Sequence, residues 1–175
     1  MITKDAIIIG GGPCGLAAAI ALQKIGLDPL IIEKGNVVNS LYHYPTHQTF
    51  FSSSEKLEIG DVAFITENRK PVRNQALSYY REVARRKNLS IHAFEKVEKV
   101  QKVKDGSFIV DTSKNRYETK YVIVATGYYD QPNMMNVPGE DLPHVFHYFK
   151  EAHPYFNCDV TVIGGKNSSV DAALE

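Results

Sequence analysis

The stretch Ala6-Ile7-Ile8-Ile9-Gly10-Gly11-Gly12-Pro13-Cys14-Gly15 decides the fold class of this chain. Its first four residues form a continuous apolar run, which is typical of a strand buried on both faces of a parallel sheet. The glycines then follow the spacing G-x-G-x-x-G. Residues 16–25 are rich in Ala and Leu and precede Gly26, as in a helix that ends at a glycine. The stretch therefore predicts a strand, a tight turn and a helix.

Each glycine of this turn has its own physical purpose. Gly10 allows the tight turn out of the strand, Gly12 lets the main chain approach a pyrophosphate, and Gly15 lets the helix pack close to the strand. The helix N-terminus around Pro13 and Cys14 offers free N–H groups and a positive dipole end to phosphate. We therefore expect this turn to bind a dinucleotide.

An acidic residue follows at the distance that a dinucleotide site requires. Residues 29–33 form a second apolar strand, which completes a β-α-β unit of about 30 residues. Glu33 ends this strand about 20 residues after the glycines, where the fingerprint places the partner of a ribose hydroxyl. Lys34 adjoins it and is included in the expected site. Strand, helix and acid together argue against a chance glycine-rich turn.

The composition is that of an ordinary globular protein. The 175 residues are 43% hydrophobic, and 20 Lys and Arg balance 20 Asp and Glu. This balance gives no reason to expect nucleic acid or a membrane surface as a partner, and no metal site is expected. No apolar run approaches the roughly 20 residues that span a bilayer. The apparent lack of a signal peptide and the presence of only two cysteines favour a cytoplasmic location.

The middle of the chain predicts a mixed sheet. Residues 35–69 are irregular and rich in aromatic side chains, and residues 74–87 have the pattern of a helix. Residues 90–120 predict an antiparallel meander, with a hairpin turn at Asp105-Gly106. We expect a Rossmann-like α/β fold in which this meander is inserted into a doubly wound parallel sheet of strands 6–9, 30–33 and 121–125.

A second strand, glycine turn and helix begins at Asp159. We expect a strand at 160–163, a turn at Gly164-Gly165-Lys166-Asn167-Ser168-Ser169 and a helix from Val170. Residues 1–158 are thus predicted to form one nucleotide-binding domain. Residues 159–175 would be the incomplete start of another.

Two motifs resemble those of two-dinucleotide flavoproteins. Ala125-Thr126-Gly127 is similar to the ATG motif that passes beside FAD, which adds Thr126 and Gly127 to the expected FAD site. The second turn resembles a nicotinamide motif that reads G-G-G-N-S-A/G-V-E/D. This resemblance implies that NADPH binds at Gly164, Gly165, Lys166, Asn167 and Ser168. Lys166 replaces a glycine, so its side chain crowds the pyrophosphate while its charge suits a phosphate.

Longer segments are similar to the bacillithiol-disulfide reductase (YpdA-type) family. These segments are GGGPCG around Cys14, residues 42–61, residues 125–130 and residues 164–169. The resemblance implies an enzyme that binds FAD, takes hydride from NADPH and reduces the disulfide of a low-molecular-weight thiol. Full-length relatives should be roughly twice as long, so this chain would be an N-terminal portion.

Cys14 is the candidate redox residue. Related reductases carry a dithiol in the stretches equivalent to 35–60 or 140–159, and here those stretches hold only Cys158. A thiolate at a helix N-terminus is stabilised. Cys14 would then form a mixed disulfide with the small thiol, which reduced flavin resolves. The alternative is a small packing residue, because this loop normally faces the pyrophosphate.

Two other functions stay open. A flavin-containing monooxygenase would carry F-x-G-x-x-x-H in the linker, but the positions aligned with it before His147 are Asp141 and Pro143. A non-catalytic, truncated flavin-binding module is the second, because the six residues after the second turn make a marginal helix. An apolar strand at 160–163 without a partner strand could pair with another copy of the chain, so a homo-oligomer is also possible.

Overall fold

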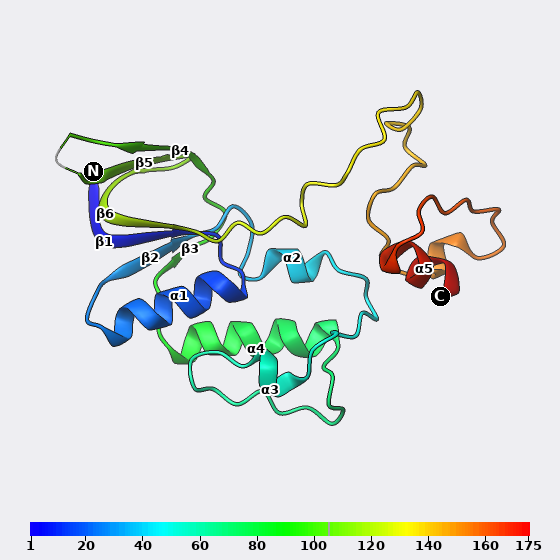
Figure 1. Cartoon of the computed structure of the whole chain (residues 1–175), viewed down its shortest axis with the longest axis horizontal. Helices are drawn as coiled ribbons and strands as arrows, with labels where there is room; N and C mark the ends of the chain where they lie inside the picture. The colour runs from blue at the N-terminus through cyan, green and yellow to red at the C-terminus, as the bar shows by residue number, and fades with distance from the viewer. Residues whose placement is uncertain (105) are drawn as a thin grey trace.

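The computed structural model describes residues 1–104 and 106–175 (Figure 1). Its elements follow the chain in the order β1 (Ile2–Ile9), α1 (Pro13–Lys24), β2 (Pro29–Ile32), α2 (Asn39–Tyr42), α3 (Ser54–Leu57), α4 (Arg73–Arg86), β3 (Ile91–His92), β4 (Val97–Lys102), β5 (Phe108–Thr112), β6 (Arg116–Val124), a 3-10 helix (His153–Tyr155) and α5 (Asn167–Leu174). No helix within these ranges is both long and apolar enough to cross a membrane.

The described strands form one mixed sheet in the order β3-β2-β1-β6-β5-β4. β1 lies between β2 and β6 and is parallel to both, with Ile8 opposite Ile31 on one side and Ile123 on the other. β4, β5 and β6 are antiparallel neighbours and form the predicted meander. The Rossmann-like fold with an inserted meander is therefore confirmed.

Two strand boundaries differ from the prediction. The meander was expected to end at residue 120 and a separate parallel strand to follow at 121–125, but β6 runs unbroken from Arg116 to Val124 and pairs with β5 and β1 at once. Residues 91–92 were assigned to the meander, but they form β3, a fourth parallel strand beside β2. Two residues are too short a segment for hydrophobic periodicity to reveal.

The two faces of the sheet are covered differently. α1 and α4 pack on one face, where Ile8 and Ile31 join Leu16 of α1 and Val83 of α4 in the main core (Figure 1). On the other face, Ile7, Leu30 and Ile32 pack against Val110 and Tyr117 of the meander. A doubly wound sheet predicts helices on both faces. Here the meander curls over the second face and buries its apolar side chains instead.

A main-chain hydrogen bond links the chain just after β4 to the chain just before β5. The Val103 N–H donates to the Ser107 carbonyl over 2.9 Å, and Gly106 has a φ of +91°. A positive φ of this kind favours glycine. Asp105, the other residue of the predicted hairpin signal, lies outside the described residues.

The predicted strand at 160–163 is not formed. Val160, Val162 and Ile163 are 54%, 44% and 67% exposed, and α5 begins three residues earlier than expected, at Asn167. An apolar segment becomes a strand only where another strand supplies main-chain partners, and no described strand lies beside this one. Of the described residues beyond β6, only Glu140 is buried. The division at residue 158 stays a prediction.

Candidate dinucleotide-binding site

The turn between β1 and α1 is packed too tightly for side chains at two of its glycines. Gly10 has a φ of +111°, and a Cβ there would lie 2.4 Å from the Ala125 carbonyl oxygen. A Cβ on Gly15 would lie 2.0 Å from the Gly10 carbonyl oxygen. The protein's own main chain therefore requires both glycines, as the fingerprint predicts.

Gly12 is different, because nothing in the described protein fills the space beside it. It has an extended conformation (φ −77°, ψ 179°) that any residue adopts, and no described atom lies within 4 Å of its Cβ position. Gly12 is also the N-cap of α1, and no described side chain caps that helix end. Pro13 and Cys14 are the first two helical residues. An uncapped helix N-terminus beside open space has the geometry that fits a pyrophosphate.

Glu33 lies directly after β2 and is 8% exposed. Its carboxylate accepts the Gly11 N–H over 2.6 Å and the Gly35 N–H over 2.7 Å. These bonds hold the carboxylate between the glycine turn and the loop that follows β2. Each carboxylate oxygen has a second lone pair, so Glu33 keeps the capacity to accept a ribose hydroxyl. Its role toward ribose stays a prediction.

The ATG segment reaches the same edge of the sheet. The Ala125 N–H donates to the Ile9 carbonyl over 2.8 Å, and the exposed Thr126 and Gly127 follow. Lys34 Nζ forms an ion pair with Asp130. β1, β2 and β6 are parallel and end together, so the structure gathers the first turn, Glu33, Lys34, Thr126 and Gly127 at their carboxyl ends. Ligands bind at this edge in open α/β sheets.

The second glycine turn is not part of this arrangement. Figure 1 places α5 far from α1, at the other end of a long segment that follows β6. Gly164, Gly165, Lys166, Asn167 and Ser168 are all exposed, and Lys166 is the N-cap of α5. Gly164 has a φ of +138°, which favours glycine. The predicted FAD and NADPH residues thus form two separate groups.

Cys14 is an exposed free thiol in the first turn of α1, and Cys158 is also free and exposed. The thiol of Cys14 is close enough to act electrostatically on Tyr80 of α4. Burial raises the pKa of Tyr80 to about 12, and the neighbouring Tyr79 and Cys14 add to the rise. Cys14 is accessible to a small reagent, but its catalytic role stays a prediction.

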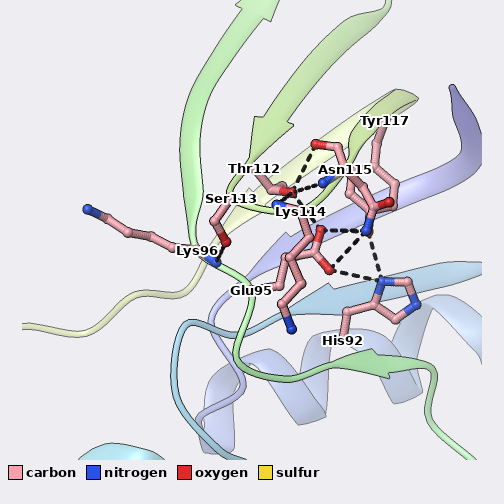
Figure 2. A network of polar contacts seen from close by, with 8 residues as sticks. All are labelled: His92, Glu95, Lys96, Thr112, Ser113, Lys114, Asn115 and Tyr117. Atoms are coloured by element: carbon pink, nitrogen blue, oxygen red, sulfur yellow. Dashed lines mark hydrogen bonds and ion pairs between the residues drawn. The ribbon is translucent and has the colours of Figure 1, made fainter.

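A buried polar network beside Glu33 was missed in the sequence. The main chain of Glu33 lies between two of its members, because the Glu33 N–H donates to the His92 carbonyl and the Glu95 N–H donates to the Glu33 carbonyl, each over 2.9 Å. Glu95 is 2% exposed and lies at the centre of the network (Figure 2). The network therefore fixes the loop that holds the expected ribose partner.

The Glu95 carboxylate is bound from several elements. It accepts hydrogen bonds from Thr112 Oγ1 at 2.6 Å, Tyr117 Oη at 2.8 Å and Asn115 Nδ2 at 3.2 Å, and His92 Nδ1 lies 3.3 Å away. Burial alone would raise the pKa of Glu95, but these hydrogen bonds and His92 outweigh it and hold that pKa below 4.5. Burial and the adjacent carboxylate raise the pKa of Tyr117 to about 12. The charged carboxylate of Glu95 thus links His92 of β3 to the meander.

The fold and the residues gathered at the carboxyl ends of β1, β2 and β6 define a class of nucleotide-binding protein. Comparison with known proteins bears this out. The chain belongs to the family of pyridine nucleotide-disulphide oxidoreductases, which it matches over residues 7–175. More particularly, it is 75% identical over 175 residues to bacilliredoxin reductase Bdr of Bacillus subtilis, covering all of this chain and 54% of that protein. The chain spans about half the length of the curated relatives it matches.

Two solved structures agree closely with this one. Bacillithiol disulfide reductase Bdr (YpdA) of Staphylococcus aureus superposes with a TM-score of 0.97 at 62% identity, covering 100% of this chain and 54% of that one. The same enzyme of Bacillus cereus gives 0.96 at 72% identity, covering 99% and 55%. The resemblance to the bacillithiol-disulfide reductase family is confirmed.

Proposed function

We propose that this chain is the FAD-binding portion of an NADPH-dependent flavoprotein that reduces the disulfide of a low-molecular-weight thiol. The observation that carries the proposal is the uncapped N-terminus of α1 beside the open space at Gly12, with Glu33 and the ATG segment at the same sheet edge. The names of the relatives supply the chemical class: a reductase of bacillithiol disulfide or of bacilliredoxin.

The residues at this edge divide into two groups by the part of FAD that they suit. The first turn holds the pyrophosphate with main-chain N–H groups, while Glu33 and Lys34 lie where the adenosine ribose belongs. Thr126 and Gly127 would contact another part of the bound cofactor. When bound, FAD supplies two-electron transfer. The residues assigned to FAD are Gly10, Gly12, Pro13, Cys14, Gly15, Glu33, Lys34, Thr126 and Gly127.

NADPH is assigned to the second turn, at Gly164, Gly165, Lys166, Asn167 and Ser168. The support is the exposed N-terminus of α5, which no described side chain caps, and the positive charge of Lys166 at that N-cap. A cation suits the phosphates of NADPH, and free N–H groups of a helix N-terminus suit them too.

Cys14 is assigned the thiol chemistry. Its thiolate attacks one sulfur of the substrate disulfide, which forms a mixed disulfide and releases the other half as a thiolate. Cleavage of the mixed disulfide to the Cys14 thiolate and the second thiol needs two electrons and one proton, and bound FAD and NADPH would supply the electrons. The support is the exposure of Cys14 and its place at a helix N-terminus.

The relatives' names leave two disulfide substrates, and an experiment separates them. A full-length protein carrying this chain should be reconstituted with FAD and mixed anaerobically with NADPH and bacillithiol disulfide. Parallel samples should contain a bacilliredoxin oxidised with bacillithiol, or no disulfide. Rapid NADPH oxidation with the small disulfide alone supports the proposal, whereas oxidation only with the bacilliredoxin would show that the substrate is a protein. NADPH consumption only after oxygen is admitted would contradict disulfide reduction.

The proposal also places the protein in the cytoplasm, where NADPH and reduced thiols are held and where unpaired cysteines are the norm. A homo-oligomer is proposed because exposed apolar side chains such as Val160, Val162 and Ile163 favour association. Light scattering during size-exclusion chromatography measures the oligomeric state. A monomer at micromolar concentration would contradict this part.

A further inference from the structure

Tyr42, at the end of α2, has its ring within cation–π distance of two cations. The Arg73 guanidinium lies 5.3 Å from the ring centroid and Lys150 Nζ lies 4.9 Å from it. Both distances are within the 6 Å at which cation–π attraction operates. Arg73 belongs to α4 of the folded core, whereas Lys150 belongs to the long segment after β6. The ring therefore joins the core to that segment.

Arg73 holds Tyr42 by its main chain as well as by its ring. The guanidinium is buried, and it donates to the Leu41 carbonyl over 3.2 Å and to the Tyr42 carbonyl over 2.5 Å. These carbonyls end a short helix, and the Leu41 carbonyl also accepts the Tyr44 N–H over 3.2 Å. These bonds anchor the Tyr42 backbone beside the guanidinium that contacts its ring.

Hydrogen bonds join the same two parts of the chain. The Thr46 N–H donates to the Lys150 carbonyl over 2.8 Å, next to the cation–π contact. The Tyr129 hydroxyl donates to the His43 carbonyl over 3.1 Å, and the Tyr148 hydroxyl donates to the Tyr129 carbonyl over 2.7 Å. The segment between β6 and α5, residues 125–166, is called the linker below. Two stretches of it, at 129 and at 148–150, are thus attached to the loop after α2.

The local charges are compatible with two cations so close together. Burial, Lys150 and Arg73 lower the pKa of His43, so its imidazole is neutral at neutral pH and adds no third positive charge. The linker is also attached to the core by the ion pair of Lys34 with Asp130 and by the edge contact of the Tyr44 and Tyr129 rings, whose centroids lie 4.7 Å apart. Glu140 is the one buried residue among those described after β6. The contacts around Tyr42 are therefore one of several attachments between the linker and the core, and the one that holds the linker at Lys150.

We propose that Arg73, Tyr42 and Lys150 form a cation–π clamp that fixes the linker and so sets where the second glycine turn lies relative to the first. The three are positioning residues, and their effect on catalysis rests on the proposed function. Loosening the clamp is expected to slow flavin reduction by NADPH without removing either cofactor, because the two turns themselves are unchanged.

Two pairs of variants test the clamp. Lys150→Met and Tyr42→Leu remove the cation or the ring, whereas Lys150→Arg and Tyr42→Phe keep them. In this chain, the exchange of the Thr46 amide hydrogen reports the clamp without any need for activity. We expect exchange to be about two- to thirty-fold faster in the first pair, the range that a cation–π contact supports, and unchanged in the second.

The second measurement is stopped-flow flavin reduction in the full-length protein. We expect Lys150→Met to lower the limiting rate while flavin content and the NADPH concentration for half-maximal rate stay constant, and Lys150→Arg to restore it. If Tyr42→Leu does not fold, Lys150→Met still tests the clamp, because Lys150 is exposed and its replacement should not disturb folding. Exchange at Thr46 that is equal in Lys150→Met and the parent, or as fast in Lys150→Arg as in Lys150→Met, would overturn the clamp. If NADPH fails to reduce the parent protein, the proposed function fails while the exchange result still judges the clamp.

Discussion

Gly12 and Gly15 belong to one motif, but the structure predicts opposite consequences for replacing them. A Cβ on Gly15 would lie 2.0 Å from the Gly10 carbonyl oxygen, about 1.4 Å inside the 3.4 Å at which ordinary contact begins. Gly15→Ala must therefore displace main chain, at a cost of about 3 kcal/mol. For a chain of this size that lowers Tm by about 6–12 °C.

Gly12→Val meets no described atom within 4 Å and needs no unusual φ. We expect its effect on stability to stay within about 1 kcal/mol, because valine is a poorer N-cap than glycine but orders the unfolded chain. Its side chain would instead occupy the space assigned to the pyrophosphate. We therefore expect a protein that is folded and free of flavin.

Both variants should be purified with the parent and compared by two measurements. Thermal unfolding of the flavin-free proteins by circular dichroism reports packing, and absorbance near about 450 nm after incubation with FAD reports binding. Retention of flavin by Gly12→Val at the parental level would refute the assignment of the pyrophosphate. An unchanged Tm for Gly15→Ala without flavin would refute the packing argument.

The remaining predictions concern Glu95, its partners and Cys14. Glu95→Gln should lower the free energy of unfolding by about 1–3 kcal/mol in urea titrations, because buried donors lose a charged acceptor. If the effects of Glu95→Gln and Tyr117→Phe simply add in the double variant, the 2.8 Å bond between these two residues contributes no coupling energy. The pKa of Glu95 lies below its unfolded value of 4.5, so its contribution is present above pH 4.5 and is lost as the pH falls through the folded pKa. The parent and Glu95→Gln should accordingly converge in stability as the pH falls, and a gap that stays constant from neutral into the acid range would count against this. In the full-length protein, Cys14→Ala should keep flavin and NADPH oxidase activity but lose disulfide reduction; an undiminished reduction rate would show that Cys14 only packs.

The parts of the fold that were predicted correctly depend on local signals. The strand, turn and helix from Ala6 to Lys24 follow from apolar runs and glycine spacing, and the meander follows from a change of period and a turn. β3 could not be predicted, because its two residues become a strand only by lying beside β2. The strand expected at 160–163 failed for the converse reason: its apolar residues have no strand beside them within the described chain.

The functional residues likewise fall into those set by local spacing and those set by tertiary packing. Glu33 was predictable because its distance from the glycines is fixed by the β-α-β unit. Glu95 and Arg73 were not, since their partners lie 17–22 and 31–32 residues away and their pairing depends on tertiary packing. Lys34 and Asp130 are 96 residues apart, and no local sequence pattern around either residue predicts their ion pair.

The unbroken course of β6 has a consequence for the order in which the chain folds. Its pairing with β5 joins residues a few positions apart, such as Asp111 and Arg116, whereas its pairing with β1 joins Ile2 to Tyr117. Local contacts close small loops and form early, while contacts across most of the chain are entropically costly and form late. We expect the meander to form first and to hold β6 extended. Its free edge then acts as a template on which the N-terminal strand docks, and the glycine turn of residues 10–15 takes shape only at that last step.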